Sequence, residues 1–323
     1  MAKLSKYNNH KAWRKQGNKL FESGHYEKAM ANYEKAIQIK PDYYEAWFDR
    51  GLVLYTLGLY QESLASYDKA IQFKPDFYEA WLNRAALLAN DSNCHKEALV
   101  NYDKVIQLKP DSYLAWDYRG RTLVDLENYE EALASYDKAI QLKPNYHNVW
   151  YNRGCLLLDL ENYEKALVNF DQVIQIKAND EEAWCRRGIT LYKLGRYKEA
   201  LESYDMTLKF KPDNEEAWYH RGAALRELGH YEEAIASYGK AIEFKSDYFK
   251  AWFARTQVLY YQLGRHQDAI AAIIEFIELN PELAEKQARI LSQLPCAKKI
   301  PFWSRIYNTF VINYYLLFKR KDK

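Results

Sequence analysis

Large apolar side chains recur along the chain at helical spacing. Tryptophan returns every 34 residues, with one interval of 35, at Trp13, Trp47, Trp81, Trp116, Trp150, Trp184, Trp218 and Trp252. When each unit is numbered so that tryptophan is its fourth position, the fourth, eighth and eleventh positions share one helical face. The twentieth, twenty-fourth and twenty-seventh positions share a second face. Each unit is therefore predicted to be two amphipathic helices.

The period divides the chain into eight predicted units. Their bounds are residues 10–43, 44–77, 78–112, 113–146, 147–180, 181–214, 215–248 and 249–283. Residues 1–9 form an N-terminal extension, residues 284–296 are predicted to be a capping helix, and residues 297–323 are an aromatic tail with basic flanks. Such a cap is expected because the last unit of a stacked array would otherwise leave its apolar end uncovered.

Several other positions repeat in step with the tryptophan. Arginine holds the seventh position in seven units, glycine the eighth in six, tyrosine or phenylalanine the twenty-fourth in seven, and proline the thirty-second in six. Glycine inside a helix costs about 1 kcal/mol relative to alanine. Its recurrence at the eighth position therefore predicts a close approach of the partner helix.

The turn between the two helices of a unit needs a residue that tolerates positive φ. Gly24, Gly58, Gly195 and Gly229 are predicted to fill this place in four units. In two other units Asn128 and Asn162, one place later, are expected to take the conformation.

This pattern resembles the tetratricopeptide repeat family, whose 34-residue signature has Trp, then Leu-Gly, Tyr, Ala, Phe and Pro. The resemblance covers residues 10–283. Departures are Arg for Leu at the seventh position, one extra residue in the turns of units three and eight, and Ala178 and Ser246 in place of proline. The resemblance implies an all-α fold, a right-handed α–α superhelix (solenoid) of about eight helix pairs, followed by the capping helix and a tail helix.

The recurrent arginine is accompanied by an acidic residue at the twenty-fifth position, which is Asp68, Asp103, Asp137, Asp171 or Asp205 in five units. One hypothesis is a structural ladder of arginine-to-aspartate contacts between helices. The alternative is a row of partly exposed guanidinium groups that a ligand could bind.

Composition and charge narrow the function classes. The chain has 46 basic and 44 acidic residues, which are mixed throughout, so the sequence shows no basic stripe and nucleic acid is not an expected partner. The first ten residues are polar and resemble no secretory signal, so a cytoplasmic location is expected. Cys94, Cys155, Cys185 and Cys296 lack CxxC spacing and are expected to be free thiols.

No catalytic, cofactor or metal motif stands out in the sequence, so a non-enzymatic protein without a cofactor is expected. Cys155 and Cys185 lie on adjacent first helices and could approach each other on the groove wall. Two thiols without further ligands make a poor zinc site, and metal binding is therefore not predicted.

The family resemblance implies that the second, fifth, sixth, ninth and twelfth positions of the first helices line a concave groove that binds a protein or peptide. The groove residues predicted in this way are Arg14, Asn18, Phe48, Asp49, Tyr55, Asn83, Tyr118, Arg121, Tyr151, Asn152, Arg186, Tyr192, Tyr219, His220, Arg226 and Tyr260. Tyrosine and arginine are common in binding hot spots. A solvated face whose tyrosines merely cover the helices is the alternative.

Some members of the family hold the carboxylate of a chaperone tail in a clamp of Lys, Asn and Arg side chains. Arg14 and Asn18 match this clamp in type. Asp49 stands where Asn is needed, and Glu79 and Asn83 stand where Lys and Arg are needed. Since an acid repels a carboxylate, no binding of such a tail is predicted.

The function predicted from these features is a non-catalytic scaffold or assembly adaptor for protein partners. The alternative is a membrane-peripheral tether, because Phe302 to Phe318 is rich in aromatic residues and has lysine and arginine on both sides. This segment is too short and polar to be a good bilayer span. It could instead pack onto the solenoid, and the sequence does not decide whether the chain self-associates.

Overall fold

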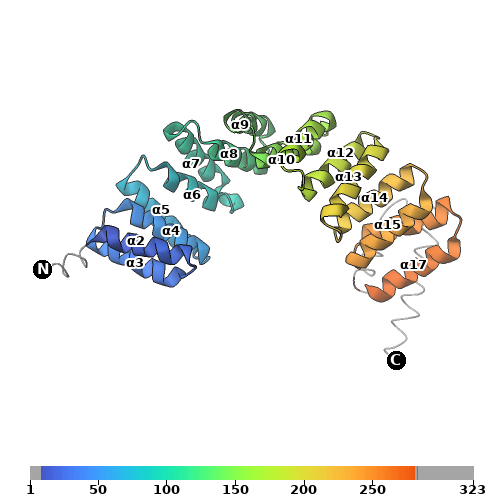
Figure 1. Ribbon diagram of the computed structural model, residues 1–323, viewed down its shortest axis with the longest axis horizontal. Helices are drawn as coiled ribbons and strands as arrows, with labels where there is room; N and C mark the ends of the chain where they lie inside the picture. Colours follow the sequence, from blue (N-terminus) through green and yellow to red (C-terminus); the bar gives the residue numbers. More distant parts are fainter. Residues whose placement is uncertain (1–8, 281, 283–323) are drawn as a thin grey trace, which may run out of the picture. The chain divides into compact units, whose positions relative to one another are not determined.

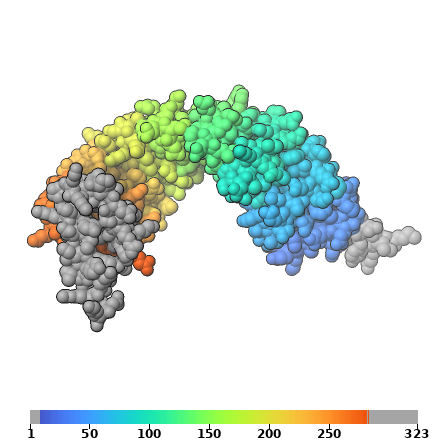
Figure 2. Space-filling model, turned by 180° about the vertical axis from the view of Figure 1, so that it is seen from behind, coloured from blue at the N-terminus to red at the C-terminus, as the bar shows by residue number. Residues whose placement is uncertain are grey.

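The computed structural model describes residues 9–280 and residue 282. Within these residues the secondary structure consists of sixteen α-helices, labelled α2 to α17, with two short irregular helical turns and no strand (Figure 1). The chain divides into two compact parts, which we call unit 1 (Met1–Leu156) and unit 2 (Leu157–Lys323). The eight repeats predicted from the sequence keep their number words, from unit one to unit eight. In the space-filling view the helices of each unit pack into a continuous surface (Figure 2). The all-α prediction is thus confirmed.

Unit 1 contains four complete helix pairs and most of α10. Its elements are α2 (His10–Glu22), α3 (Tyr26–Ile39), α4 (Tyr44–Thr56), α5 (Tyr60–Phe73), α6 (Tyr78–Leu88), a 3-10 turn (Ser92–Cys94), α7 (His95–Leu108), α8 (Tyr113–Asp125), α9 (Tyr129–Leu142) and α10 (His147–Asp159).

Unit 2 continues the same alternation of helices. Its elements are α11 (Tyr163–Ile176), α12 (Glu181–Lys193), α13 (Tyr197–Phe210), α14 (Glu215–Glu227), α15 (Tyr231–Phe244), α16 (Phe249–Gln257), a π-helical turn (Val258–Gln262) and α17 (His266–Leu279). Even-numbered helices are called first helices below, and odd-numbered ones second helices.

The core of each pair is built from alanine and one large aromatic side chain. In α9, Ala132, Tyr136 and Ala139 are buried and face α8 and α10. The close approach predicted at the eighth position is real, because a Cβ atom placed on Gly120 of α8 would lie 2.6 Å from Cε1 of Tyr136. The glycine therefore makes room for the tyrosine ring, and this contact offsets its low helix propensity.

Tryptophan fixes the loop that precedes each first helix. The Nε1 of Trp47 donates a hydrogen bond to the carbonyl oxygen of Pro41 at 2.8 Å, and Trp81, Trp116, Trp150 and Trp218 repeat this bond in their own units. Where Ala178 and Ser246 replace proline, their carbonyl oxygens still accept from Trp184 and Trp252, both at 2.9 Å. The loss of proline therefore leaves the turn unchanged.

Arginine at the seventh position forms a repeated contact that we call a rung. In a complete rung, Nε of the arginine bonds to the acid of the preceding second helix, and Nη1 bonds to a serine or asparagine of its own second helix. Arg119 bonds to Asp103 at 2.8 Å and to Ser135 at 2.8 Å, and its guanidinium lies over the ring of Trp116. The ladder hypothesis is confirmed, since five acid-paired arginines are only 17–23% exposed.

The prediction for two of the turns was wrong. Asn128 and Asn162 have φ of −91° and −89°, whereas the residues before them, Glu127 and Glu161, have positive φ of 59° and 58°. Glu127 also donates its amide to the carbonyl oxygen of Val124 at the end of α8. The position at the end of the first helix thus determines which residue has positive φ, and the type of side chain does not.

The extra residue of unit eight does not lie in the turn, as the sequence had suggested. It is absorbed within the first helix, where the amide of Leu263 bonds to the carbonyl oxygen of Val258, a five-residue spacing. One inserted residue inside a helix is accommodated by such a π-turn. In unit three the extra residue does lie between the helices, at the 3-10 turn.

Candidate functional site

Two adjoining cavities lie on the first helices of unit 1. The first has a volume of about 220 Å³ and is lined by Tyr55, Ala86, Ala89, Asn90, Tyr102, Tyr118, Arg121, Thr122 and Asp125. The second, of about 270 Å³, is lined by Asp117, Tyr118, Arg121, Tyr146, Asn148, Tyr151 and Asn152. Tyr118 and Arg121 belong to both. We call the surface formed by these two cavities the unit-1 groove.

Helix α8 provides the centre of this groove, because one of its faces is buried in the core and the other carries Tyr118 and Arg121. It begins at Ser112, whose hydroxyl accepts the amide of Ala115, and it buries Ala115, Gly120 and Leu123. Tyr118 is only half-buried and Arg121 is exposed. The guanidinium carbon of Arg121 lies 5.9 Å from the centre of the Tyr118 ring, so an aromatic surface and a cation lie side by side.

Asp117 is the most buried polar residue of the groove, with 1% of its surface exposed. Burial raises the pKa of its carboxyl group, although the amide of Asn152 donates a hydrogen bond to it at 3.0 Å. Arg121 also favours the charged form electrostatically. A carboxylate held with this little solvent is a strong acceptor for a donor that enters the groove.

Two tyrosines, Tyr118 and Tyr146, interact with this carboxylate. Burial raises the pKa of Tyr118 and of Tyr146, so both hydroxyls stay protonated at neutral pH. The ring of Tyr146 packs edge-on against Tyr113 with centroids 5.0 Å apart, and its hydroxyl accepts a hydrogen bond from Asn148. The groove therefore offers hydroxyl donors and acceptors, amides, one buried acid and one exposed guanidinium.

Five of the predicted groove residues meet in the unit-1 groove, namely Tyr55, Tyr118, Arg121, Tyr151 and Asn152. The other predicted residues of this unit make local contacts. Phe48 packs against Phe77 with ring centroids 5.1 Å apart. The amide of Asn83 donates to the carbonyl oxygen of Glu79 in its own helix.

Arg14, Asn18 and Asp49 form a separate cluster at the start of unit 1. Arg14 makes an ion pair with Asp49, and the side-chain amide of Asn18 lies 2.9 Å from the hydroxyl of Tyr33. Asp49 is 8% exposed and burial raises its pKa. Since Asp49 engages Arg14, the prediction that this surface does not hold a carboxylate tail stays in place.

Unit 2 has a cavity of its own, of about 320 Å³, and Arg186 is the predicted residue that lines it. Its other lining residues are Glu181, Glu182, Cys185, Lys211, Asn214, Glu215 and Glu216. Four glutamates against two basic residues give this cavity an excess of negative charge. Burial raises the pKa of Cys185 to about 12, so this thiol stays protonated and unreactive.

The remaining predicted residues of unit 2 form three smaller contacts. The Tyr192 hydroxyl donates to Glu227, which also pairs with Arg226 at 2.6 Å. Tyr219 packs edge-on against His220, with ring centroids 5.0 Å apart. The ring of Tyr260 lies 4.3 Å from that of His266.

The sequence reasoning did not select Asp117, Tyr146 or Asn148. Asp117 and Asn148 hold the fifth and second positions of their units, so the positional rule includes them, and only the choice among side chains left them out. Tyr146 precedes α10 in a loop, at the last position of its unit. Tyr43, Phe77 and Tyr248 hold the same position in other units, and this recurrence is the signal that could have indicated it.

Metal sites and membrane-spanning helices are two further features to consider in the described residues. No group of three or more His, Cys, Asp or Glu side chains in this part of the chain is arranged to hold a metal ion. None of the helices in residues 9–280 combines the length and apolar character that a membrane span needs. The predicted tail segment, Phe302 to Phe318, and the predicted capping helix lie outside the described residues.

Family models match most of the chain. A model described as "TPR repeat" matches residues 17–58, 120–160 and 222–261. Two models described as "Tetratricopeptide repeat" match residues 44–77, 147–180 and 181–214, and residues 258–283. No curated protein matches the chain.

Solved structures of similar fold include YrrB, described as a TPR protein with an unusual peptide-binding site. It is 28% identical, with a TM-score of 0.52 over 58% of this chain and 97% of YrrB. A tetratricopeptide repeat protein from Parabacteroides merdae is 18% identical, with a TM-score of 0.56 over 77% of this chain and 98% of its own. Pseudomonas aeruginosa pilF is 18% identical, with a TM-score of 0.58 over 66% and 97%.

Proposed function

Because the chain belongs to the tetratricopeptide repeat family, we propose that it is a non-catalytic scaffold that holds an extended segment of a partner protein in the unit-1 groove. The observation that carries this proposal is the continuity of two cavities through Tyr118 and Arg121. Aromatic rings give contact area at a small entropic cost, and Arg121 and Asp117 give direction to hydrogen bonds.

The chemistry of the groove favours a polypeptide over a small substrate. Its lining alternates tyrosine with amide, acid and guanidinium groups, which suit the amide and carbonyl groups of an extended chain. The peptide-binding site described for YrrB, which is 28% identical, supports the same type of ligand. Binding without covalent chemistry is the function that we assign to this lining.

Crosslinking in cell lysate tests the proposal. The full chain and a Tyr118→Ala, Arg121→Ala double variant are compared, and Tyr129→Ala, which removes an exposed tyrosine of the second helix α9, serves as the control. We expect the double variant to lose proteins that the full chain and the control both capture. Capture of the same proteins by all three would show that the groove is not the binding surface.

A membrane-peripheral tether is a second candidate, favoured by the aromatic and basic sequence of residues 297–323. Sedimentation with anionic liposomes, comparing the full chain with residues 1–296, separates it from the scaffold proposal. Equal recovery of the two proteins would exclude the tether and leave the groove proposal untouched.

A further inference from the structure

The last arginine of the ladder differs from the others in its partners. In unit seven, Nε of Arg221 donates to Asp205 at 2.7 Å and Nη1 donates to Ser237 at 2.8 Å. Arg255 holds the same position in unit eight, on α16. The residue that corresponds to Asp205 is Gly239, and the residue that corresponds to Ser237 is Ala272. Both partners of a complete rung are therefore replaced by residues that accept no side-chain hydrogen bond.

The consequence is a donor without an acceptor. Nε of Arg255 is buried and has no hydrogen-bond partner among the described residues. This N–H group loses hydration without gaining a hydrogen bond, which is unfavourable. An anion that reached it would gain a charge-assisted hydrogen bond.

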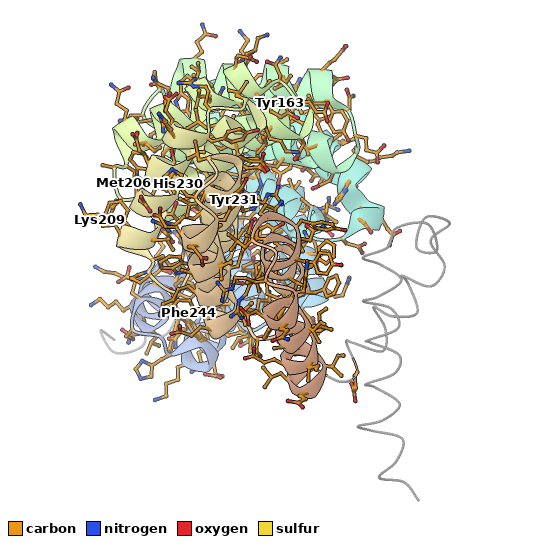
Figure 3. The ribbon with its side chains drawn as sticks, turned by 90° about the vertical axis from the view of Figure 1, so that its right-hand side faces the viewer. Tyr163, Met206, Lys209, His230, Tyr231 and Phe244 are labelled. Atoms are coloured by element: carbon orange, nitrogen blue, oxygen red, sulfur yellow. The ribbon has the colours of Figure 1, made fainter. Side chains whose placement is uncertain are left out.

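The place beside Gly239 has room for that anion. This residue lies in α15, the helix that runs from Tyr231 to Phe244 (Figure 3). A Cβ atom built on Gly239 meets no heavy atom within 4 Å. In the five rungs with an aspartate, the acid side chain is 47–58% exposed, so the carboxylate of a rung lies at the surface. Arg255 itself is partly exposed, although its Nε is buried.

We propose that Arg255 and Gly239 form a binding site for a carboxylate of a partner protein, an aspartate or glutamate side chain that takes the place Asp205 takes beside Arg221. The planar guanidinium matches a carboxylate in shape, and five rungs of this chain already pair the two groups. None of the residues of this site belongs to the unit-1 groove, so the inference is independent of the proposed function.

The arginine Nε–H resonances of the full chain provide a direct test, with Arg255→Lys used for assignment. Acetate contains the atoms of an aspartate side chain beyond Cα, so it is the probe, and acetamide is its uncharged control. We expect acetate, at constant ionic strength, to shift the Arg255 resonance in a saturable way, while the resonances of Arg84, Arg119 and Arg221 stay in place. Equal shifts for all four arginines, or an equal shift with acetamide or chloride, would overturn the proposal.

Three variants make the test independent of any folding defect. Gly239→Asp should abolish the acetate response of Arg255 and raise the melting temperature. Gly239→Asn should not produce either effect to the same extent. Asp205→Gly should create a second responsive arginine, Arg221. A blocked Gly-Glu-Gly peptide should act like acetate, and Gly-Gln-Gly should not.

One outcome would assign the site to this chain's own sequence instead. If residues 283–323 supplied the carboxylate, acetate would not move the Arg255 resonance and Gly239→Asp would not raise the melting temperature. That pair of results would contradict an external ligand.

Discussion

Two glutamates hold a backbone conformation that other turns of the chain give to glycine. Glu127 and Glu161 have φ near 60°, while Gly58 and Gly195 in the equivalent turns have φ of 77° and 74°. A residue with a Cβ atom is strained in this region by about 1–3 kcal/mol. The turns at Glu127 and Glu161 are therefore less stable than the same turns would be with glycine.

Replacing Glu127 with glycine should stabilise the protein by about 0.5–1 kcal/mol, because relief of the strain exceeds the extra flexibility of glycine in the unfolded chain. The measurement is the free energy of unfolding in urea. Glu130→Gly is the matched control, since Glu130 is helical in the first turn of α9 and glycine there should cost about 0.5–1 kcal/mol. Two changes of the same sign would contradict the strain argument.

The buried acid of the groove also has a cost to stability. Burial raises the pKa of Asp117 above its usual value of 3.8, so the folded chain binds its proton more tightly than the unfolded chain does. The contribution of this group to stability is therefore lost as the pH rises from that value through the raised pKa.

Asp117→Asn should consequently raise the melting temperature at pH 7, and its advantage over the original chain should shrink as the pH falls toward 3.8. Thermal unfolding of both proteins between pH 4 and pH 7 measures this, and Asp125→Asn, an exposed change in the same helix, is the control. A constant difference across the pH range would rule out the protonation of Asp117 as the cause.

At the scale of the helix pair, the rung joins three elements through one side chain. The side chain of Arg119 is 19% exposed and bonds to Asp103 of α7 and to Ser135 and Glu131 of α9. Isolated surface ion pairs contribute less than about 1 kcal/mol. A mostly buried guanidinium with several acceptors is a stronger contact, since hydrogen bonds to charged groups contribute about 1.5–3 kcal/mol.

Arg119→Ala should therefore destabilise the chain by about 2 kcal/mol, whereas Arg255→Ala, which removes no such bonds, should change stability by less than about 0.5 kcal/mol. Urea unfolding of both variants measures the difference, and a double-mutant cycle with Asp103→Ala isolates the ion pair. Similar losses for the two arginines would mean that packing of the side chain, and not the rung, provides the stability.

The helix pairs were predictable from the sequence because tryptophan, glycine and tyrosine each have a packing role at a fixed position. The exceptions have local physical causes. The turn at Glu127 was missed because the end of α8 sets which residue is left-handed. The π-turn at Val258 was missed because sequence shows that a residue is inserted and does not show which helix absorbs it.

The groove was predictable only in part for a related reason. The positional rule indicates which side of a first helix a residue occupies, and three residues that it selected, Tyr118, Arg121 and Tyr151, line one cavity. It does not indicate contacts with neighbouring units. Phe48 packs against Phe77, the last residue of its own unit, and Arg14 pairs with Asp49 of the next unit, so neither side chain is free to line a cavity.

At the scale of the whole chain, contacts connect each helix with its close neighbours in sequence. Within unit 2, α13 contacts α12 and α14, and α15 contacts α14 and α16. The same order holds in unit 1 from α2 to α9. In a protein built from such contacts, the free energy of unfolding is approximately the sum of the stabilities of the single repeats and of the interfaces between neighbouring repeats. A destabilising substitution should therefore affect mainly the helices next to it.

Leu191→Ala tests this locality, because Leu191 of α12 is fully buried in a cluster with Leu167, Tyr204 and Ala224. The substitution should cost about 2–5 kcal/mol of local stability. Amide hydrogen exchange should become faster in α11 to α14 and stay unchanged in α2 to α5. Leu160→Ala, at a residue 42% exposed, is the control and should alter neither region. An equal loss of protection in α2 to α5 would instead mean that the two units unfold as one.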